Sequence, residues 1–170
     1  MNRFRQIPAT TFEFNPFRAI GKDWMLIAAE KDGKINAMTA SWGGFGRIWE
    51  KDAAFAFIRQ SRFTKEFVDA ADTFSLNFLD HDKYAEMLSY MGTVSGRDED
   101  KIAKSSLTPV HFAETPYFDE ASFAVICRKM ANQLLPPESF LMDWIDKRCY
   151  ANHDYHTLYI SEAVAILKKD

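Results

Sequence analysis

The stretch WMLIAAEKDGKINAMTASW, residues 24–42, limits the fold more than any other part of the 170-residue chain. Two apolar runs, residues 24–30 and 35–42, flank the dipeptide Asp32-Gly33. Asp-Gly between two such runs is a strong signal for a tight turn that joins antiparallel strands. We therefore expect a β-hairpin with its turn at KDGK.

Further strands are expected where apolar, aromatic and β-branched residues continue or alternate. These segments are residues 53–59, 74–79, 122–135 and 156–169. Between them the sequence predicts only short helices: one with Thr64 as its N-cap, one over 83–91, a turn over 101–105, and one that Pro137 is well placed to start. A doubly wound sheet needs a longer helix after every strand, so we expect a mainly β fold, a barrel or sandwich with peripheral helices, in one domain over residues 1–170.

Composition excludes several classes of protein. The formal charge of −3 is spread along the chain without a long basic run, which disfavours nucleic-acid binding. The two cysteines, Cys127 and Cys149, have no metal-binding spacing and favour a reducing compartment. No apolar run approaches a membrane span, so we expect a soluble, cytoplasmic protein. Aromatic residues reach 15%, which suggests a large interface or a stacked ligand.

The segment RQSRFT, residues 59–64, has the chemistry of an anion site. It lies where a strand is expected to end and a helix to begin, and a helix N-terminus favours anions. Arg59 and Arg62 flank Gln60 and Ser61, and guanidinium groups match phosphate oxygens with paired hydrogen bonds. The alternative is that the arginines form surface ion pairs and Thr64 only caps the helix.

The segment NAMTASWGG, residues 36–44, places hydroxyls on alternate residues of the hairpin's second strand. Thr39 and Ser41 point to one face together, and they can line the same pocket as the arginines if the strands run side by side. The alternative is that Thr39 and Ser41 lie on a solvent-exposed face of the strand, while the apolar residues between them pack against the core. Gly43, Gly44 and Gly46 are then ordinary turn residues.

Two other features are ambiguous by themselves. The loop SGRDEDK, residues 95–101, offers a hydroxyl, a guanidinium and an ammonium that can close over a ligand, but it is also an ordinary polar loop. His156 begins a predicted strand without an identifiable nucleophile as partner, and a lone histidine is more often structural than catalytic.

Six runs of the sequence resemble a known family. They are NAMTASWGGFGRIW, FIRQSRFTKEF, FSLNFL, MGTVSGRDEDKIAKSSLTP, EASFAVICRK and DYHTLYISEA, in this order over nearly the whole chain. Together they are similar to the flavin reductase family with the FMN-binding split-barrel fold, especially its flavoredoxin-like branch. The resemblance implies a split β-barrel that binds FMN.

The resemblance also implies roles for individual residues. Along the flavin it places Asn36, Met38, Thr39, Ala40, Ser41 and Trp42; at the phosphate Arg59, Gln60, Ser61, Arg62 and Thr64; and in a loop near the cofactor Ser95, Gly96, Arg97 and Lys101. His156 would lie near the nicotinamide or the flavin. No catalytic side chain and no metal ligand is assigned, because the cofactor itself carries out the hydride chemistry.

The chain departs from the family pattern at one position. Similar sequences usually have H-x-x-Y/F-I-G-E near the end, whereas this chain reads HTLYISE, with Ser161 in place of the glycine. If that glycine allows a ligand or partner subunit to approach the backbone, Ser161 narrows the space.

The function that the resemblance implies is an NAD(P)H-dependent flavin reductase. NADH or NADPH would deliver hydride to FMN, and the electrons would pass to an unidentified flavin, metal or protein acceptor. A homodimer with the flavin near the subunit boundary is expected. Two alternatives stay open: a flavoredoxin-like electron carrier without nicotinamide activity, and a flavin-free binding module of the same fold.

Overall fold

The computed structural model describes residues 4–170. They form one large antiparallel sheet with short helices around it. Its strand order is β3-β2-β6-β9-β10-β5-β4, and β1 pairs with β10. The strands are β1 (Phe4–Ile7), β2 (Met25–Lys31), β3 (Lys34–Ala40), β4 (Gly43–Ile48), β5 (Lys51–Arg59), β6 (Thr73–Phe78), β9 (Phe123–Leu134) and β10 (His156–Lys169). A separate hairpin pairs β7 (Pro109–Phe112) with β8 (Thr115–Phe118).

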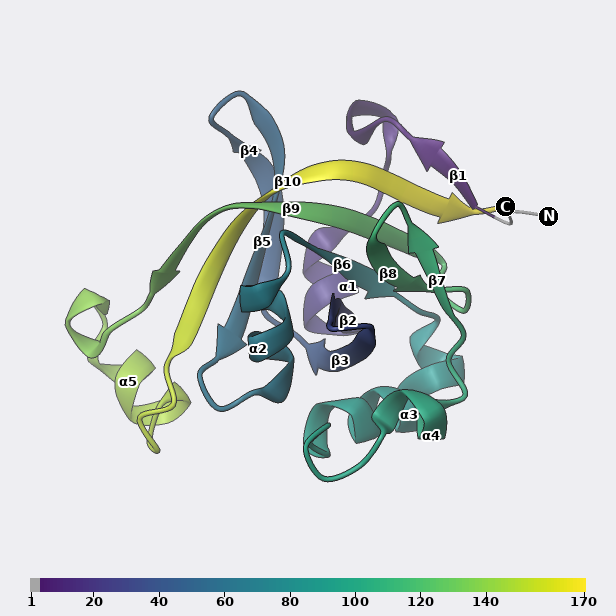
Figure 1. Ribbon diagram of the computed structural model, residues 1–170. Coiled ribbons are helices and arrows are strands. Elements are labelled where there is room, and N and C mark those ends of the chain that lie inside the picture. Colours follow the sequence, from purple (N-terminus) through teal and green to yellow (C-terminus); the bar gives the residue numbers. More distant parts are fainter. Residues whose placement is uncertain (1–3) are drawn as a thin grey trace.

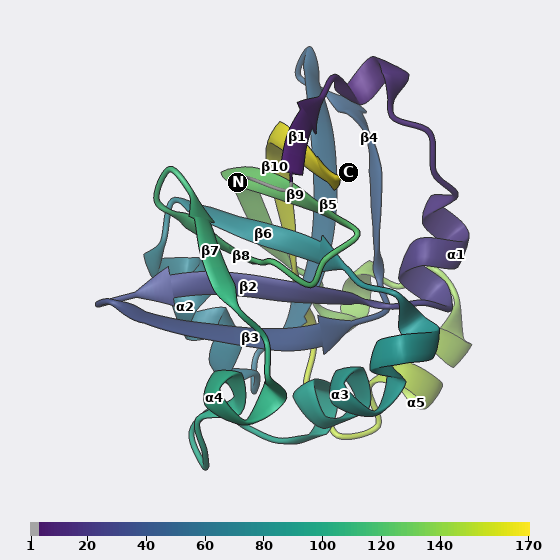
Figure 2. The ribbon, with the colours of Figure 1, turned by 90° about the vertical axis from the view of Figure 1, so that its right-hand side faces the viewer.

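The two long strands β9 and β10 give the sheet its barrel shape. They bend across the whole molecule in Figure 1 and carry β6 and β2 on one side and β5 and β4 on the other. Their pairing shifts register between Ile160 and Ser161 and again between Ala163 and Ala165, and such irregularities increase bend and twist. In Figure 2 the β2–β3 hairpin therefore runs crosswise to β4 and β5. The predicted mainly β barrel fold is confirmed.

The predicted hairpin is present, with its turn at KDGK. Lys31 pairs with Lys34, and the two residues between them have positive φ angles, 52° for Asp32 and 72° for Gly33. Both central residues of a type I′ turn need this conformation, which Asp-Gly adopts at low cost.

The alternative interpretation of the glycines after Trp42 as ordinary turn residues does not hold. Gly43, Gly44 and Gly46 lie in β4 and pair with β5. A Cβ on Gly43 would lie 2.7 Å from the carbonyl oxygen of Phe55, so β4 can approach β5 this closely only with a glycine there.

The helices are short and lie around the sheet. They are α1 (Pro16–Gly21), α2 (Phe63–Ala70), α3 (His81–Thr93), α4 (Lys101–Ser105) and α5 (Asp143–Cys149), with 3₁₀ turns η1 (Ala9–Thr11) and η2 (Pro137–Ser139). Pro137 opens η2, as predicted. The prediction of Thr64 as an N-cap is wrong, because α2 begins at Phe63 and its N-cap is Arg62 without a side-chain capping bond. Thr64 is instead buried within the first turn.

The functional interest lies where the barrel meets its peripheral segments. Residues 135–155, between β9 and β10, form a projection that contains η2 and α5 and extends beyond the barrel in Figure 1. We call this segment the α5 arm. Helix α1 lies beside β4 in Figure 2, and α3 and α4 lie below β3. The C-terminal end of β3, opposite the hairpin turn, is thus surrounded by the arm, α1 and α3.

Ser161 occupies the core of the sheet. Its side chain is fully buried in β10 between β5 and β9, and its hydroxyl has no hydrogen-bond partner among the described residues. The side chain is therefore enclosed by the protein itself and does not face ligand space within this chain.

We predict that Ser161→Ala raises the free energy of unfolding by about 1 kcal/mol, because a buried hydroxyl without a partner loses its hydrogen bonds to water and gains none in the protein. Ser75→Ala is the matched control. Its hydroxyl is equally buried but donates to the Pro116 carbonyl at 2.6 Å and accepts from Asn77 at 2.8 Å. Urea denaturation should show stabilisation at Ser161 and destabilisation at Ser75; loss of stability at both sites would contradict the assignment.

Candidate functional site

A cavity of about 190 Å³ lies between the end of β3 and the junction of β5 with α2. We call it the cation cavity. It is lined by Met38, Thr39, Ala40, Ser41, Trp42, Phe57, Arg59, Arg62 and His156. Strands β3 and β5 are remote in the strand order, but the coiling of the sheet brings their ends to one place. The hydroxyl-bearing strand and the two arginines therefore do line the same pocket.

Arg59 ties the barrel to the α5 arm. Its guanidinium donates to the carbonyl of Asp154 at 2.7 Å and to that of Cys149 at 3.0 Å. The same group lies over the ring of Tyr150, 5.2 Å from its centroid, and 5.8 Å from that of Trp42. Arg59 thus contributes charge to the cavity, while two of its donors serve the protein.

Arg62 differs from Arg59 because its guanidinium has no hydrogen bond or ion pair with any residue from 4 to 170. Burial, and then the charge of Arg59, lower the pKa of Arg62, while Asp154 opposes this effect. The Asp154 carboxylate is already engaged, since it accepts bonds from the amide and the hydroxyl of Ser61 at 3.0 and 2.5 Å. The Arg62 guanidinium therefore faces the cavity without a hydrogen-bonded partner, next to the charge of Arg59, and this arrangement favours an anion.

Lys101 adds a third positive charge close to Arg62. Its side chain is only 3% exposed, and the ammonium donates to the carbonyl of Met91 at 2.9 Å. Burial, and then the charge of Arg62, lower the pKa of Lys101 to about 8. A buried ammonium that is paired with a carbonyl rather than a carboxylate gains from a nearby anion.

Other residues of RQSRFT are engaged with the protein. Gln60 donates from Nε2 to the hydroxyl of Thr157 at 2.6 Å. The hydroxyl of Thr64, 1% exposed, accepts from Nδ2 of Asn36 at 2.7 Å. Neither Gln60, Thr64 nor Asn36 lines the cation cavity. Their bonds join the segment after β5 to β10, and α2 to β3.

The SGRDEDK loop packs against the outside of the site. The guanidinium of Arg97 donates to the carbonyl of Ser61 at 3.0 Å, and its amide donates to the hydroxyl of Ser95 at 3.2 Å. A Cβ on Gly96 would lie 2.2 Å from Oδ1 of Asn36, so a larger residue there would displace the side chain of Asn36. The loop lines a separate polar cavity of about 580 Å³ that also includes Asn36 and Lys101. It supports the cation cavity and does not line it.

The end of β3 presents backbone as well as side chains. This strand is the last in the sheet order, so alternate N–H and C=O groups along its outer edge have no ladder partner. Met38 and Ala40 are buried, and Thr39 donates its hydroxyl to the Leu88 carbonyl of α3 at 2.5 Å. Ser41 is exposed and lines the cavity. The hydroxyls therefore have different tasks: Thr39 fixes α3, and Ser41 is accessible to a ligand.

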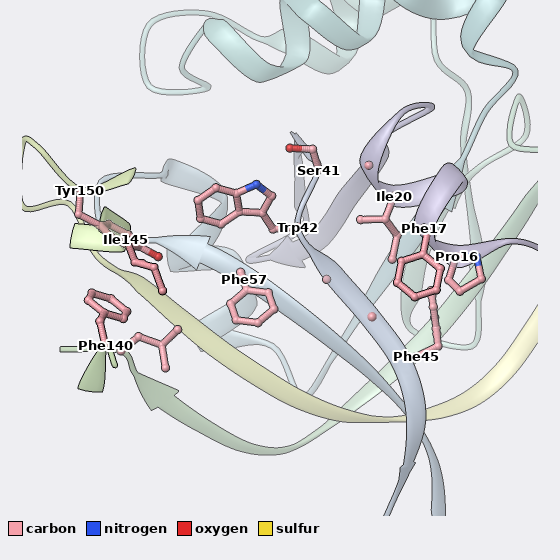
Figure 3. A pocket seen from close by; sticks show the side chains of 14 residues that line it. Pro16, Phe17, Ile20, Ser41, Trp42, Phe45, Phe57, Phe140, Ile145 and Tyr150 are labelled. Carbon is pink, nitrogen blue, oxygen red and sulfur yellow. The ribbon is translucent and has the colours of Figure 1, made fainter. Parts of the chain in front are cut away.

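A larger cavity of about 560 Å³ adjoins the first, and we call it the apolar cavity. Figure 3 shows Trp42 and Phe57 between the α5 arm on one side and α1 on the other. The residues that line it are Pro16, Phe17, Ile20, Gly21, Ser41, Trp42, Gly43, Gly44, Phe45, Phe57, Leu135, Phe140, Ile145 and Tyr150. Because Ser41, Trp42 and Phe57 line both cavities, the two form a continuous charged and aromatic site.

His156 lies at the junction of the two cavities. The side chain is buried, its Nδ1 lies 2.8 Å from the hydroxyl of Tyr150, and its ring centroid lies 4.8 Å from that of Trp42. Burial, and then the charge of Arg59, lower the pKa of His156 to about 4. The imidazole is therefore neutral near pH 7 and adds no charge to the site.

The sequence reasoning missed most of the apolar cavity. Phe140, Ile145 and Tyr150 come from the α5 arm, and Phe17 comes from a helix that was not predicted. The high aromatic content was the available signal, but it does not indicate which rings converge.

Residues 17–170 match the model of the flavin reductase like domain. The chain belongs to this family. No curated protein matches the sequence. In the part of the family domain that the structure describes, no helix is long and apolar enough to cross a membrane, and no three His, Cys, Asp or Glu residues are placed to hold a metal ion.

Solved structures give the same assignment of fold. The flavoredoxin of Methanosarcina acetivorans has a TM-score of 0.69 at 19% identity over 87% of this chain and 69% of that one. An FMN-binding domain of a flavin reductase-like enzyme from Shewanella baltica OS155 has a TM-score of 0.69 at 16% identity, over 99% of this chain and 78% of that one. The styrene monooxygenase flavin reductase of Pseudomonas putida S12 has a TM-score of 0.61 at 14% identity, over 85% of this chain and 77% of that one. At these low identities the TM-scores show a shared fold, and the split β-barrel is confirmed.

We predict that His156 makes stability depend on pH in a defined window. The unfolded chain binds a proton at His156 below about pH 6.5, whereas the folded chain does so only near pH 4. Stability is therefore lost as the pH falls from about 6.5 towards 4, by up to roughly 3 kcal/mol from this residue. Urea denaturation at a series of pH values measures this. From pH 6.5 to 4, the free energy of unfolding should fall less for His156→Gln than for the wild type, whereas His153→Gln, a change at an exposed residue, should behave like the wild type. Parallel curves for all three proteins would refute the prediction.

Proposed function

We propose that this chain is an FMN-binding flavin reductase, in which NADH or NADPH reduces the flavin and the electrons pass to a flavin, metal or protein acceptor. The observation that carries the proposal is the pairing of the two cavities. One holds partly desolvated, poorly compensated cations, and the other is aromatic and uncharged. A mononucleotide with an anionic tail and a flat ring matches this pairing.

The residues present fit the phosphate of FMN. Arg62 has no partner among residues 4–170 and supplies the direct contact, while Arg59 and Lys101 supply further positive charge. Gln60, Ser61 and Thr64 act through the protein contacts that they already make. This assignment is narrower than the sequence-based one, which treated all of 59–62 and 64 alike.

The outer edge of β3 fits the polar edge of the flavin ring. Free backbone donors and acceptors beside Met38, Thr39 and Ala40, and the accessible hydroxyl of Ser41, offer the hydrogen bonds that such an edge needs. When bound, FMN supplies the capacity to accept a hydride from a nicotinamide and to release the electrons again.

The protein's own part in the reaction is to position and to shield. Trp42 and Phe57 cover the boundary between the cavities with apolar surface and limit the access of water. The cations near the phosphate-bearing side chain of FMN and the N–H groups of β3 would favour the reduced, more negative flavin. The neutral imidazole of His156 packs beside Trp42 without opposing this charge balance. No side chain is required as a general base.

We propose in addition a cytoplasmic homodimer with the flavin near the interface. Large apolar side chains beside the apolar cavity support this, since Phe17 is 89% exposed and Leu141 98% exposed. The free thiols of Cys127 and Cys149 are consistent with a reducing compartment.

A second candidate is an electron carrier that holds FMN but receives electrons from another protein. Its support is that similar structures include the flavoredoxins of Methanosarcina acetivorans and Desulfovibrio vulgaris (Miyazaki F). The cavities favour the reductase, because a second ring has access to the site beside Trp42.

We predict that Arg62→Ala weakens FMN binding by at least roughly tenfold, because one charge-assisted contact contributes about 1.5–3 kcal/mol. Riboflavin lacks the phosphate, so its affinity should change little. Arg62 is preferable to Arg59 as a target, because Arg59 also anchors the α5 arm. The exposed Arg18→Ala is the control. Titration of both flavins by fluorescence quenching measures the effect, and equal losses for FMN and riboflavin would remove the phosphate assignment.

A further inference from the structure

We propose that the hydroxyl of Tyr159 and the carboxylate of Asp69 position Arg62 in the cation cavity, by fixing helix α2 on the barrel. Both are positioning residues, because neither lines either cavity of the site. The inference rests on the proposed function in one respect, namely that Arg62 contacts the phosphate of FMN. It goes beyond that function by assigning the residues that place this contact.

Arg62 depends on α2 for its place. No residue from 4 to 170 bonds its guanidinium, so the backbone at the start of α2 sets where its charge lies. The helix has eight residues, Phe63–Ala70, and its N-cap, Arg62, makes no side-chain capping bond. A helix this short is marginal without tertiary contacts. The position of Arg62 is therefore set by the contacts that tie α2 to the sheet.

Asp69 ties the C-terminal end of α2 to the two long strands. Its carboxylate accepts a hydrogen bond from the hydroxyl of Tyr159 in β10 at 2.5 Å and pairs with Lys65 at 2.7 Å. Its backbone carbonyl accepts a bond from the ammonium of Lys129 in β9 at 2.9 Å. The helix dipole disfavours a carboxylate in the last turn, which contains no basic residue. The bonds to β9 and β10 therefore explain Asp69 better than the helix alone does.

Tyr159 gives this tie a rigid support. Its side chain is fully buried in β10, which pairs with β5 on one side and β9 on the other. Burial, and then the bond to Asp69, raise the pKa of Tyr159. Burial acts to raise the pKa of Asp69 too, but the bonds from Lys65 and Tyr159 outweigh it and lower this pKa. At neutral pH the hydroxyl therefore donates to an ionised carboxylate, which is the stronger kind of hydrogen bond.

The other end of α2 is held separately. The hydroxyl of Thr64 accepts from Nδ2 of Asn36 in β3 at 2.7 Å. A helix that is bonded at one end alone can still tilt and turn about its axis, whereas bonds at both ends fix its orientation. Since a turn of α2 moves the side chain of its N-cap residue, the Asp69–Tyr159 bond sets the direction in which Arg62 leaves the helix.

The test measures the affinity for FMN and for riboflavin by fluorescence quenching, in the wild type, Tyr159→Phe, Arg62→Ala and the double variant. Tyr159→Phe keeps the buried ring and removes only the bond. We expect it to weaken FMN binding by about threefold or more and to leave riboflavin binding unchanged, because the lost preorganisation concerns the phosphate contact alone. When Arg62 is already alanine, the same change should have little further effect, since it acts through Arg62.

Tyr155→Phe is the matched control. Its hydroxyl donates to Asp146 at 2.9 Å within the α5 arm, so the same kind of bond is lost away from α2. Asp69→Ala removes the proposed bond from its half-exposed end and serves as the second variant if Tyr159→Phe folds poorly. It too should weaken FMN binding selectively, although the removal of a negative charge by itself favours an anion.

The outcomes separate the inference from the proposed function. Equal affinity of the wild type and Arg62→Ala for FMN would refute the phosphate assignment, and the inference with it. Where Arg62→Ala does weaken FMN binding, three results would overturn the inference alone. They are unchanged FMN affinity in both Tyr159→Phe and Asp69→Ala, a selective loss of the same size in Tyr155→Phe, and full additivity of the Tyr159 and Arg62 changes.

Discussion

The bonds of Arg59 hold the site together. This side chain extends from the last residue of β5 to two carbonyls of the α5 arm, and its guanidinium lies against Trp42 and Tyr150. One group thus fixes the arm, forms part of the wall between the two cavities and contributes positive charge to the cation cavity. Together with the Ser61–Asp154 bonds and the contact between Tyr150 and His156, this link fixes the arm's aromatic rings opposite α1.

The division of the site into a charged and an uncharged cavity follows from the shape of the sheet. Because β9 and β10 bend, the free end of β3 meets the end of β5, and cations from two segments gather where carboxylates are few. Burial lowers the pKa of both Arg62 and Lys101, and the nearby charge of Arg59 adds to the effect on Arg62 and that of Arg62 to the effect on Lys101. The folded protein therefore holds electrostatic strain, which an anion relieves, beside an aromatic space that an anion avoids.

The sequence predicted local features well and long-range ones poorly. The strand at 156–169 was found with its observed bounds, and the Asp32-Gly33 turn has the expected positive φ angles, because both depend on near neighbours. Strand β4 was missed, since Gly43 marks a close approach to β5 rather than a turn. The partner of Thr39 in α3 and the rings of the α5 arm depend on tertiary placement, which no local pattern contains.

The measurement that tests the account most directly is the visible spectrum of the purified protein, supplied with FMN and then with NADH or NADPH in the absence of oxygen. Bound, oxidised flavin gives visible absorption bands, and reduction removes them. The account predicts a yellow protein that either nicotinamide bleaches and air restores. A protein that FMN does not colour would contradict the flavin site, and a yellow protein that neither nicotinamide bleaches would contradict the reductase in favour of the electron carrier.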